Sequence, residues 1–255
     1  MARAIPDWVV LDDYTDVDLG VLKTGKEAEI SVVERTAVDG RSCLLALKRY
    51  RPRTVTHKGE LQELGFDRAP TFRNDHVYRD GRRFTRRSRD ARAIAAMTGY
   101  GKTLLNERWH GHEHDIMSRL WEAGASVPYP VESHDGGMLM EYVGDTTAAA
   151  PRLAQARLAA TEVADAYGQL LENLRTFLEV GIVHSDLSAF NILWWRGGLW
   201  FIDFPQAVDV AHSPHALDFL HRDLTNICSW FSRRGVATDP EALFAELLAV
   251  TFPMR

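Results

Sequence analysis

The sequence predicts an α+β protein with two lobes, in which a β-rich part is followed by a helical part. Before residue 50, apolar residues alternate with other residues on both sides of Asp39 and Gly40, a pair typical of a two-residue hairpin turn. After residue 151, apolar residues recur at steps of three and four, as on one face of a helix. The chain has 255 residues, close to the size at which a single core stops growing, which favours two lobes.

The composition excludes several classes of protein. Hydrophobic residues make up 45% of the chain and charged residues 25%, which excludes disordered, collagen-like and disulfide-scaffold chains. The net charge of −5 does not suit a protein whose whole surface binds nucleic acid. Cys43 and Cys228 have neither a C-x-x-C nor a zinc-finger spacing, so we expect free thiols in a core. No stretch resembles a membrane span or a signal peptide, so we expect a cytoplasmic protein without membrane contact.

A long basic insertion follows the first hairpin. From about residue 51 to residue 102 the alternation is lost, and seven arginines lie between Arg79 and Arg92 with only two acidic residues among them. Loops of this length are commonly functional or mobile. The arginines favour either an RNA or acidic protein partner, or a solvated loop.

The remaining elements follow from apolar periodicity and from the residues that end each run. Apolar steps of three and four predict helices, and short apolar runs bounded by glycine turns predict strands. Gly124 and Gly181 are typical of helix ends, and Asp239 before Pro240 is typical of a helix start. The predicted elements are, in order, a helix over 104–122, an extended segment over 127–140 with a turn at 135–137, a helical stretch from 151 to 178, a hairpin with strands at 192–195 and 199–203, and helices over 214–233 and 240–250.

Three polar residues of the second half have the spacing of a phosphoryl-transfer site. Asp186 lies five residues before Asn191, and Asp203 follows the second hairpin, which turns the chain back on itself. Phosphoryl transfer needs one carboxylate to position the attacking hydroxyl, and an amide and a second carboxylate to hold magnesium. We therefore assign Asp186 as the base and Asn191 and Asp203 as metal ligands, although each residue alone is also typical of a turn.

Lys48 and Glu113 are the next candidates. Lys48 ends an apolar strand, and Glu113 lies on the helix predicted after it. A lysine held by a helical glutamate is how kinases direct a cation at the α- and β-phosphates of ATP. The alternatives are a solvated lysine and a solvated helix face.

Three segments of the chain resemble motifs of the RIO family of atypical serine/threonine protein kinases. They are TGKEAEI at 24–30, similar to the phosphate loop, HSDLSAFN at 184–191, similar to the catalytic loop, and IDFPQAV at 202–208, similar to the metal loop. The chain resembles the first RIO subfamily most, while its metal loop resembles that of the second. The resemblance implies a protein-kinase-like fold of RIO type with a small β-rich N-terminal lobe and a reduced helical C-terminal lobe.

The resemblance also implies boundaries, an activity and a set of site residues. We expect an N-terminal segment at 1–19, an N-terminal lobe at 20–143 that includes the insertion, and a C-terminal lobe at 144–255. The implied activity is ATP-dependent phosphorylation of Ser and Thr hydroxyls of proteins, including the chain itself, with Mg²⁺ or alternatively Mn²⁺. Asp186 and Asp203 would be the catalytic residues. The implied ATP-binding residues are Gly25, Lys26, Glu27, Lys48, Glu113, Met140, Glu141, Val143 and Ser188.

Two other functions stay open. In the RIO family the metal-loop aspartate is associated with an aspartyl-phosphate, so the chain would act as an ATPase switch on a ribonucleoprotein such as a precursor of the small ribosomal subunit. A small-molecule phosphotransferase is the third function, although its catalytic loop usually has histidine where Ser188 stands.

A metal site at His110, His112 and His114 is a competing interpretation of the first helix. Two histidines four residues apart on a helix can share a metal, but the order is not H-E-x-x-H and no third ligand lies nearby. A solvated helix face is the simpler interpretation.

Overall fold

The computed structural model describes residues 3–25, 28–50, 99–134 and 136–251. Lys26, Glu27 and the segment from Arg79 to Arg92 lie outside the described residues, as does nearly all of the expected insertion.

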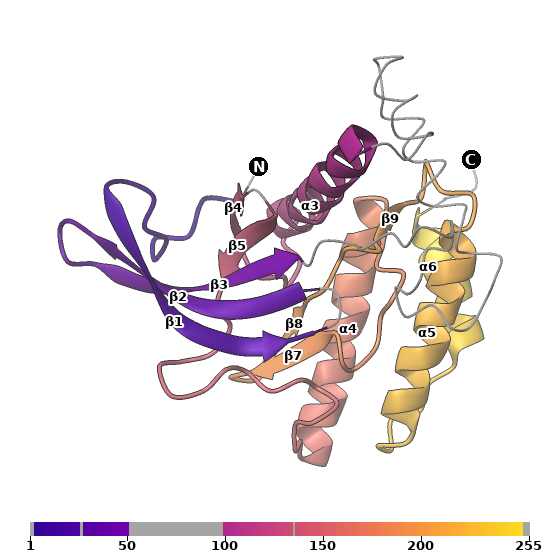
Figure 1. Cartoon of the computed structure of the whole chain (residues 1–255). Coiled ribbons are helices and arrows are strands. Elements are labelled where there is room, and N and C mark those ends of the chain that lie inside the picture. Colours follow the sequence, from indigo (N-terminus) through magenta and orange to yellow (C-terminus); the bar gives the residue numbers. More distant parts are fainter. Residues whose placement is uncertain (1–2, 26–27, 51–98, 135, 252–255) are drawn as a thin grey trace.

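The first lobe is a five-stranded antiparallel sheet (Figure 1). Its strands are β1 (Tyr14–Thr24), β2 (Ala28–Ala37), β3 (Ser42–Tyr50), β4 (Pro130–His134) and β5 (Gly137–Glu141), in the spatial order β1-β2-β3-β5-β4. The hairpin predicted around Asp39 and Gly40 is confirmed, since β2 and β3 pair antiparallel and Gly40 has a φ of +88° at the turn. The second hairpin of this lobe, β4 with β5, is confirmed as well.

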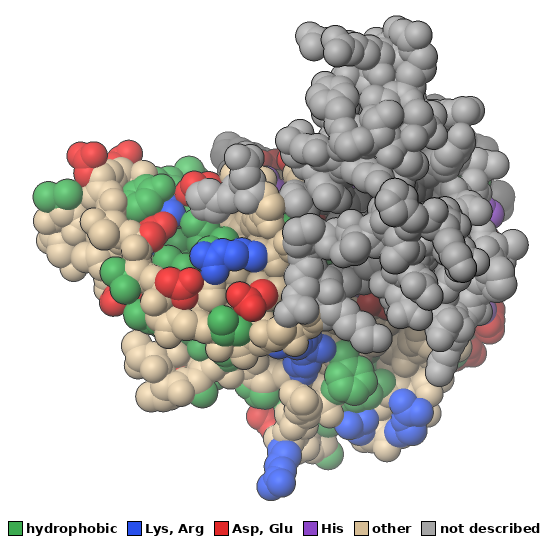
Figure 2. Space-filling model, viewed as in Figure 1, with side chains coloured by type: hydrophobic (Ala, Val, Ile, Leu, Met, Phe, Trp, Pro, Cys, Tyr) green, Lys and Arg blue, Asp and Glu red, His purple; other side chains and the backbone are tan. Residues whose placement is uncertain are grey.

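Strand β1 is an exposed edge strand that the sequence pattern does not reveal. All of its residues are exposed, so they show no alternation between core and solvent. Val17, Leu19 and Val21 are each at least half exposed, and Figure 2 shows hydrophobic and acidic side chains interspersed over the sheet. The strand begins at Tyr14, ahead of the boundary expected at residue 20.

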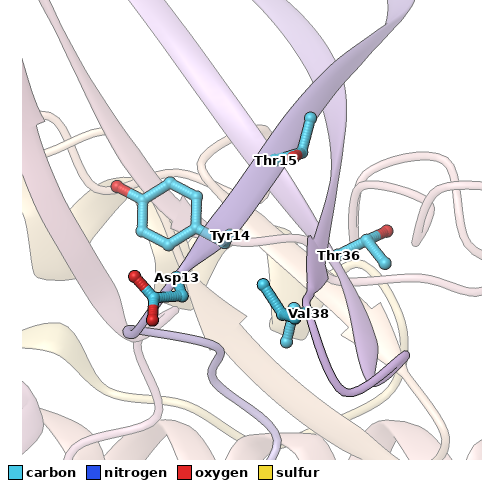
Figure 3. A pocket seen from close by; sticks show the side chains of 6 residues that line it. Asp13, Tyr14, Thr15, Thr36 and Val38 are labelled. Atoms are coloured by element: carbon cyan, nitrogen blue, oxygen red, sulfur yellow. The ribbon is translucent and has the colours of Figure 1, made fainter.

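A shallow hollow lies at the far end of the sheet from the predicted phosphate loop (Figure 3). The pair Tyr14 and Ala37 stands at one end of the β1–β2 ladder, and the pair Thr24 and Glu29 at the other. No candidate site residue borders this hollow, which is lined by Asp13, Tyr14, Thr15, Thr36, Ala37 and Val38.

Helix α3 (Gly99–Glu122) joins the sheet to the second lobe. It packs against β4 and β5, yet Ile116 and Leu120 belong to the same buried cluster as Phe177 and Phe201 of the second lobe. The predicted helix is confirmed, with a start five residues earlier than expected. Because its side chains enter the core of the other lobe, α3 fixes how the two lobes meet.

The second lobe, in its described residues, is mainly helical, with two short antiparallel strand pairs, β6 with β9 and β7 with β8 (Figure 1). It comprises α4 (Ala160–Glu179), β6 (Ile182–Val183), β7 (Ile192–Trp195), β8 (Gly198–Phe201), β9 (Val208–Asp209), α5 (Ala216–Ser232) and α6 (Pro240–Thr251). The β7–β8 hairpin and both C-terminal helices are confirmed, and the Asp239 carboxylate accepts the N–H groups of residues 241 and 242 as a helix cap.

The helical stretch expected from residue 151 is wrong in its first part. Residues 151–153 run beside β7, where Leu153 N–H donates to the Ile192 carbonyl at 2.8 Å and Trp194 N–H donates to the Pro151 carbonyl at 2.9 Å. These strand-like bonds use backbone groups that a helix would need, so α4 begins only at Ala160.

Two further expectations can be compared with the described residues. Cys43 and Cys228 are both buried and unpaired, as expected. None of the described helices combines the length and the apolar character that crossing a membrane requires.

Gly137 is required where β5 approaches β3. A Cβ atom there would lie 2.4 Å from the Lys48 carbonyl oxygen. We expect Gly137→Ala to force the two strands apart and to lower the free energy of unfolding by about 1–3 kcal/mol, the usual cost of overpacking. Urea unfolding measures this. Gly111→Ala on α3 is the matched control, because no atom lies within 4 Å of its added Cβ, and equal effects of both substitutions would contradict the close approach.

Candidate active site

Lys48 lies between two carboxylates from different parts of the chain. Its Nζ is 2.8 Å from Oε1 of Glu113 on α3 and 2.7 Å from Oδ1 of Asp203, which follows β8. Lys48 and Glu113 are buried, whereas the Asp203 side chain is 42% exposed. Burial alone would lower the pKa of Lys48, but the two carboxylates outweigh it and raise that pKa. The lysine is therefore held as a cation, with Asp203 between it and solvent.

Glu113 holds three groups in place. Besides Lys48, it accepts hydrogen bonds from the Tyr50 hydroxyl and, at 3.0 Å, from the Phe204 N–H of the metal loop. Burial and the Glu113 charge raise the pKa of Tyr50, so its hydroxyl stays a donor. One carboxylate thus ties the sheet, α3 and the metal loop together.

The catalytic loop brings Asp186 and Asn191 into contact. Asn191 Nδ2 donates to the Asp186 carboxylate at 3.0 Å and to the Asp186 carbonyl at 2.9 Å. Asp186 is exposed at the surface, yet the protein around its carboxyl partly desolvates it and raises its pKa. This direction makes the carboxylate a stronger base. Ser188 lies within the same loop, where its hydroxyl accepts the Phe190 N–H at 3.3 Å.

The catalytic and metal loops lie side by side. Ile202 N–H donates to the Asn191 carbonyl at 3.0 Å, and the His184 ring lies 3.1 Å from the Ile202 carbonyl. Asp203 has a φ of +72° and Ser185 a φ of +64°, values that non-glycine residues adopt rarely and that cluster at active sites, although Asp13 and Arg196 have positive φ outside this site. The three predicted residues Asp186, Asn191 and Asp203 therefore belong to one continuous site.

Asn191 and Asp203 suit a hard divalent cation. Desolvation would raise the pKa of Asp203, but Lys48 outweighs it and keeps that pKa low, so the carboxylate is ionised. Because Asn191 donates its amide N–H to Asp186, its amide oxygen is left for a ligand. Carboxylate and amide oxygens are the ligands that Mg²⁺ takes in proteins, together with phosphate oxygens.

The histidines of α3 take a different role from the metal site considered above. The His112 Nε2 lies 2.9 Å from the Ala207 carbonyl oxygen. A carbonyl only accepts hydrogen bonds, so Nε2 carries a hydrogen and donates it. In the part of the chain that the structure describes, neither His112 nor His114 belongs to a group of three metal-ligating side chains. His112 instead contacts the segment that follows Asp203.

The sheet face that carries Lys48 also carries an apolar surface. Val32 lies opposite Ala46, and Ala46 lies opposite Met140, so the three side chains form a row across β2, β3 and β5. Ala46 lies two residues before Lys48 on β3, so the apolar row and the Lys48 side chain are on the same face of the sheet, next to each other. Met140 is half-buried there, as a residue against a base would be.

The segment after β5 differs from β5 in how its backbone N–H groups are used. The Glu141 N–H donates to the Tyr129 carbonyl at 2.8 Å, so this donor is already used. The Val143 carbonyl accepts the Ala150 N–H at 2.9 Å, while no described residue accepts the Val143 N–H. Of the expected ATP-binding residues Glu141 and Val143, Val143 is thus the one whose N–H has no acceptor among the described residues.

The phosphate loop is described only in part. Gly25 N–H donates to the Ala28 carbonyl at 2.8 Å across the β1–β2 turn, and a Cβ at Gly25 would lie 3.1 Å from that oxygen. The turn is therefore tight enough to favour glycine. Lys26 and Glu27, which we also expected to contact ATP, lie outside the described residues.

The sequence interpretation missed Asp223, which supports the catalytic loop from below. Its Oδ1 accepts the Leu187 N–H at 3.1 Å, while its Oδ2 is buried without a hydrogen-bond partner among the described residues. The neighbouring Arg222 donates to the Ser185 carbonyl. The signal was present, because Asp223 stands at an apolar position of α5, three residues after Leu220 and four before Ile227.

Burial raises the pKa of Asp223 to about 8. Between about pH 4 and pH 8 the folded protein then keeps a proton that the unfolded chain releases, so wild-type stability should fall as pH rises through this range. Asp223→Asn retains the acceptor for Leu187 and cannot ionise. We therefore expect this variant to gain stability relative to wild type, on the order of 1–3 kcal/mol, between pH 5 and pH 8.

Urea unfolding of both proteins at the two pH values measures this difference. Asp165→Asn, at an exposed position of α4, is the control and should follow wild type. Parallel pH curves for wild type and Asp223→Asn would show that Asp223 is ionised throughout.

Comparisons with known proteins agree with this geometry. The family model for the RIO domain matches residues 71–243. The RIO-type serine/threonine-protein kinase Rio1 of Haloferax volcanii is 30% identical over 236 residues, covering 92% of this chain and 70% of its own length. Serine/threonine-protein kinase RIO3 of Bos taurus is 36% identical over 129 residues, covering 50% of this chain and 25% of its own. The chain thus spans about a quarter of the length of that RIO3 relative.

A solved structure shows the same fold. The Rio2 kinase–ADP/Mg²⁺–phosphoaspartate complex from Chaetomium thermophilum superposes with a TM-score of 0.59 at 20% identity, covering 95% of this chain and 62% of that one. The predicted kinase-like fold of RIO type is therefore confirmed. Since the RIO domain match extends over well more than half of the chain, this protein belongs to the RIO domain family.

Proposed function

We propose that this protein transfers the γ-phosphate of ATP to Ser or Thr hydroxyls of proteins. The observation that carries the proposal is the buried contact of Lys48 with Glu113 and Asp203, beside the contact of Asn191 with Asp186. A cation for phosphate, two oxygen ligands for a divalent ion and a carboxylate base meet in one place, as phosphoryl transfer requires. Relatives named serine/threonine-protein kinases support it.

Each side chain has one task in this proposal. Lys48 binds the α- and β-phosphates, and Glu113 keeps Lys48 charged and directed. The nucleotide base binds to the Val143 N–H and to the side chains of Val32, Ala46 and Met140. Bound Mg²⁺ would neutralise phosphate charge, with Asn191 and Asp203 as its protein ligands.

Asp186 acts on the acceptor. Its carboxylate orients the hydroxyl and takes the proton as the new bond forms between that oxygen and the γ-phosphorus, while the bond to the β–γ bridging oxygen breaks and ADP leaves. The Asn191 amide holds the carboxylate in one orientation. The raised pKa of Asp186 favours uptake of the proton.

An ATPase switch is the second candidate. Asp203 is partly exposed and held at a positive φ, so its carboxylate is accessible to a phosphorus atom. The Rio2 kinase structure is described as a phosphoaspartate complex. A ribosomal or RNA partner and a cytoplasmic location stay predictions, since the basic segment from Arg79 to Arg92 lies outside the described residues.

Asp186→Asn should lower phosphoryl transfer about 10²–10⁴-fold, the usual contribution of a positioned base. ATP affinity should change little, because the Asp186 carboxylate contacts the acceptor hydroxyl and not the nucleotide. Incubation with γ-labelled ATP and Mg²⁺, with calorimetry of ATP binding alongside, measures both quantities. Label that is stable on Ser or Thr indicates the kinase, whereas a hydroxylamine-labile adduct that Asp203→Asn abolishes indicates the switch. Undiminished transfer by Asp186→Asn would refute the assignment.

Lys48→Met should lower both the free energy of unfolding and the affinity for ATP. The substitution leaves the buried Glu113 without its counterion, which typically costs about 3–5 kcal/mol. Adding Glu113→Gln removes the uncompensated charge, so we expect the double variant to regain much of the lost stability without regaining ATP affinity. Urea unfolding and ATP binding separate the two effects. A double variant that binds ATP like wild type would remove Lys48 from the site.

A further inference from the structure

Two cations near the site have no part in the mechanism above. Lys23 comes from the end of β1 in the sheet, and Arg152 comes from the segment that runs beside β7 in the other lobe. Neither residue makes a hydrogen bond or an ion pair with any described side chain.

The strand register places Lys23 on the sheet face of Lys48. Lys23 lies opposite Ile30, and Ile30 lies opposite Lys48, so the three residues form a row across β1, β2 and β3. Adjacent strands are about 4.8 Å apart, which puts the backbones of the two lysines roughly 10 Å from each other. A flexible lysine side chain can cross much of that distance.

Backbone pairing places Arg152 beside β7, the strand that follows the catalytic loop. The backbone of Arg152 pairs with that of Leu193 in an antiparallel β-bridge. Backbone hydrogen bonds of the neighbouring Pro151 and Leu153 to β7 hold it there. Leu193 follows Asn191 by two residues, so Arg152 stands next to the strand that leaves the catalytic loop. Arg152 is half-buried, which limits the directions its side chain can take.

Lys23 lies close enough to Arg152, Lys48 and Asp203 for their charges to act on it. Partial burial lowers the pKa of Lys23, and the positive charges of Arg152 and Lys48 lower it further, while Asp203 opposes them. Together with the strand register and the backbone pairing, this places Lys23 and Arg152 near the Lys48–Asp203 contact.

Further cations would strengthen the binding of a polyanion at this site. The Lys48 ammonium is already paired with two carboxylates, those of Glu113 and Asp203, which leaves it little positive charge for a phosphate chain. Lys23 and Arg152 would add two positive charges from the protein to those of the proposed Mg²⁺.

We propose that Lys23 and Arg152 bind the phosphate chain of the nucleotide from opposite sides of the cleft. The inference rests on the proposed function and assigns it two phosphate ligands, one from each lobe. An acidic or phosphorylated acceptor has the same chemistry as a nucleotide phosphate, so the test includes both.

The experiment compares affinities of the full chain for ATP, AMP and adenosine by calorimetry in the presence of Mg²⁺. Lys23→Gln and Arg152→Gln should each weaken ATP binding about tenfold, the size of one charge-assisted hydrogen bond, and should leave adenosine binding unchanged. Lys23→Arg should retain ATP affinity. Arg41→Gln, at the β2–β3 turn where Arg41 pairs with Asp39, is the control and should behave as wild type.

The outcomes separate the two proposals. ATP affinity that is unchanged in both variants, or a parallel loss for ATP and adenosine, would overturn the phosphate role. Unchanged ATP affinity with slower labelling of an acidic or phosphorylated peptide would also overturn it, and would assign the cations to the acceptor. A wild-type chain that binds no ATP would instead refute the proposed function.

Discussion

The buried charge of Lys48 is the constraint on which the rest of the structure depends. A buried ammonium group is costly unless carboxylates surround it, and here they come from α3 and from the metal loop. Glu113 in turn has its oxygens satisfied by Lys48, Tyr50 and the Phe204 N–H. A shift of α3 along the sheet would break several of these bonds together. The network therefore fixes the position of α3 between the lobes more tightly than apolar packing alone.

The same constraint extends to the catalytic loop through backbone bonds. The metal loop is held at Phe204 by Glu113, and its Ile202 bonds the Asn191 carbonyl. Asn191 then holds the Asp186 carboxylate, while Asp223 holds the loop from α5. Two of the four described non-glycine residues with positive φ, Ser185 and Asp203, lie inside this set of bonds, so the surrounding contacts offset their strain. Asp186, Asn191 and Asp203 are therefore held in place by the protein's own contacts.

Sequence reasoning agrees with the structure where elements are local in the chain. The hairpins are predicted from turn residues and are present, and Asp186, Asn191 and Asp203, chosen for their spacing around a hairpin, lie in two adjoining loops; their roles stay predictions. It failed where long-range packing decides: β1 has no buried face, and residues 151–153 were predicted helical although β7 pairs with them. Lys23 and Arg152 belong to the same class, because only strand register and backbone pairing show that they lie in the strands and segments beside the site.

The Lys48–Asp203 contact joins the two lobes directly, at 2.7 Å. Under the proposed function, a divalent ion on Asp203 would compete with Lys48 for the charge of the carboxylate, so bound phosphates would have to draw Lys48 toward themselves. The lowered pKa of Asp203 would keep the carboxylate ionised for that exchange. Glu113 also accepts the Phe204 N–H, so the lobes would keep a second connection while the ion pair is exchanged.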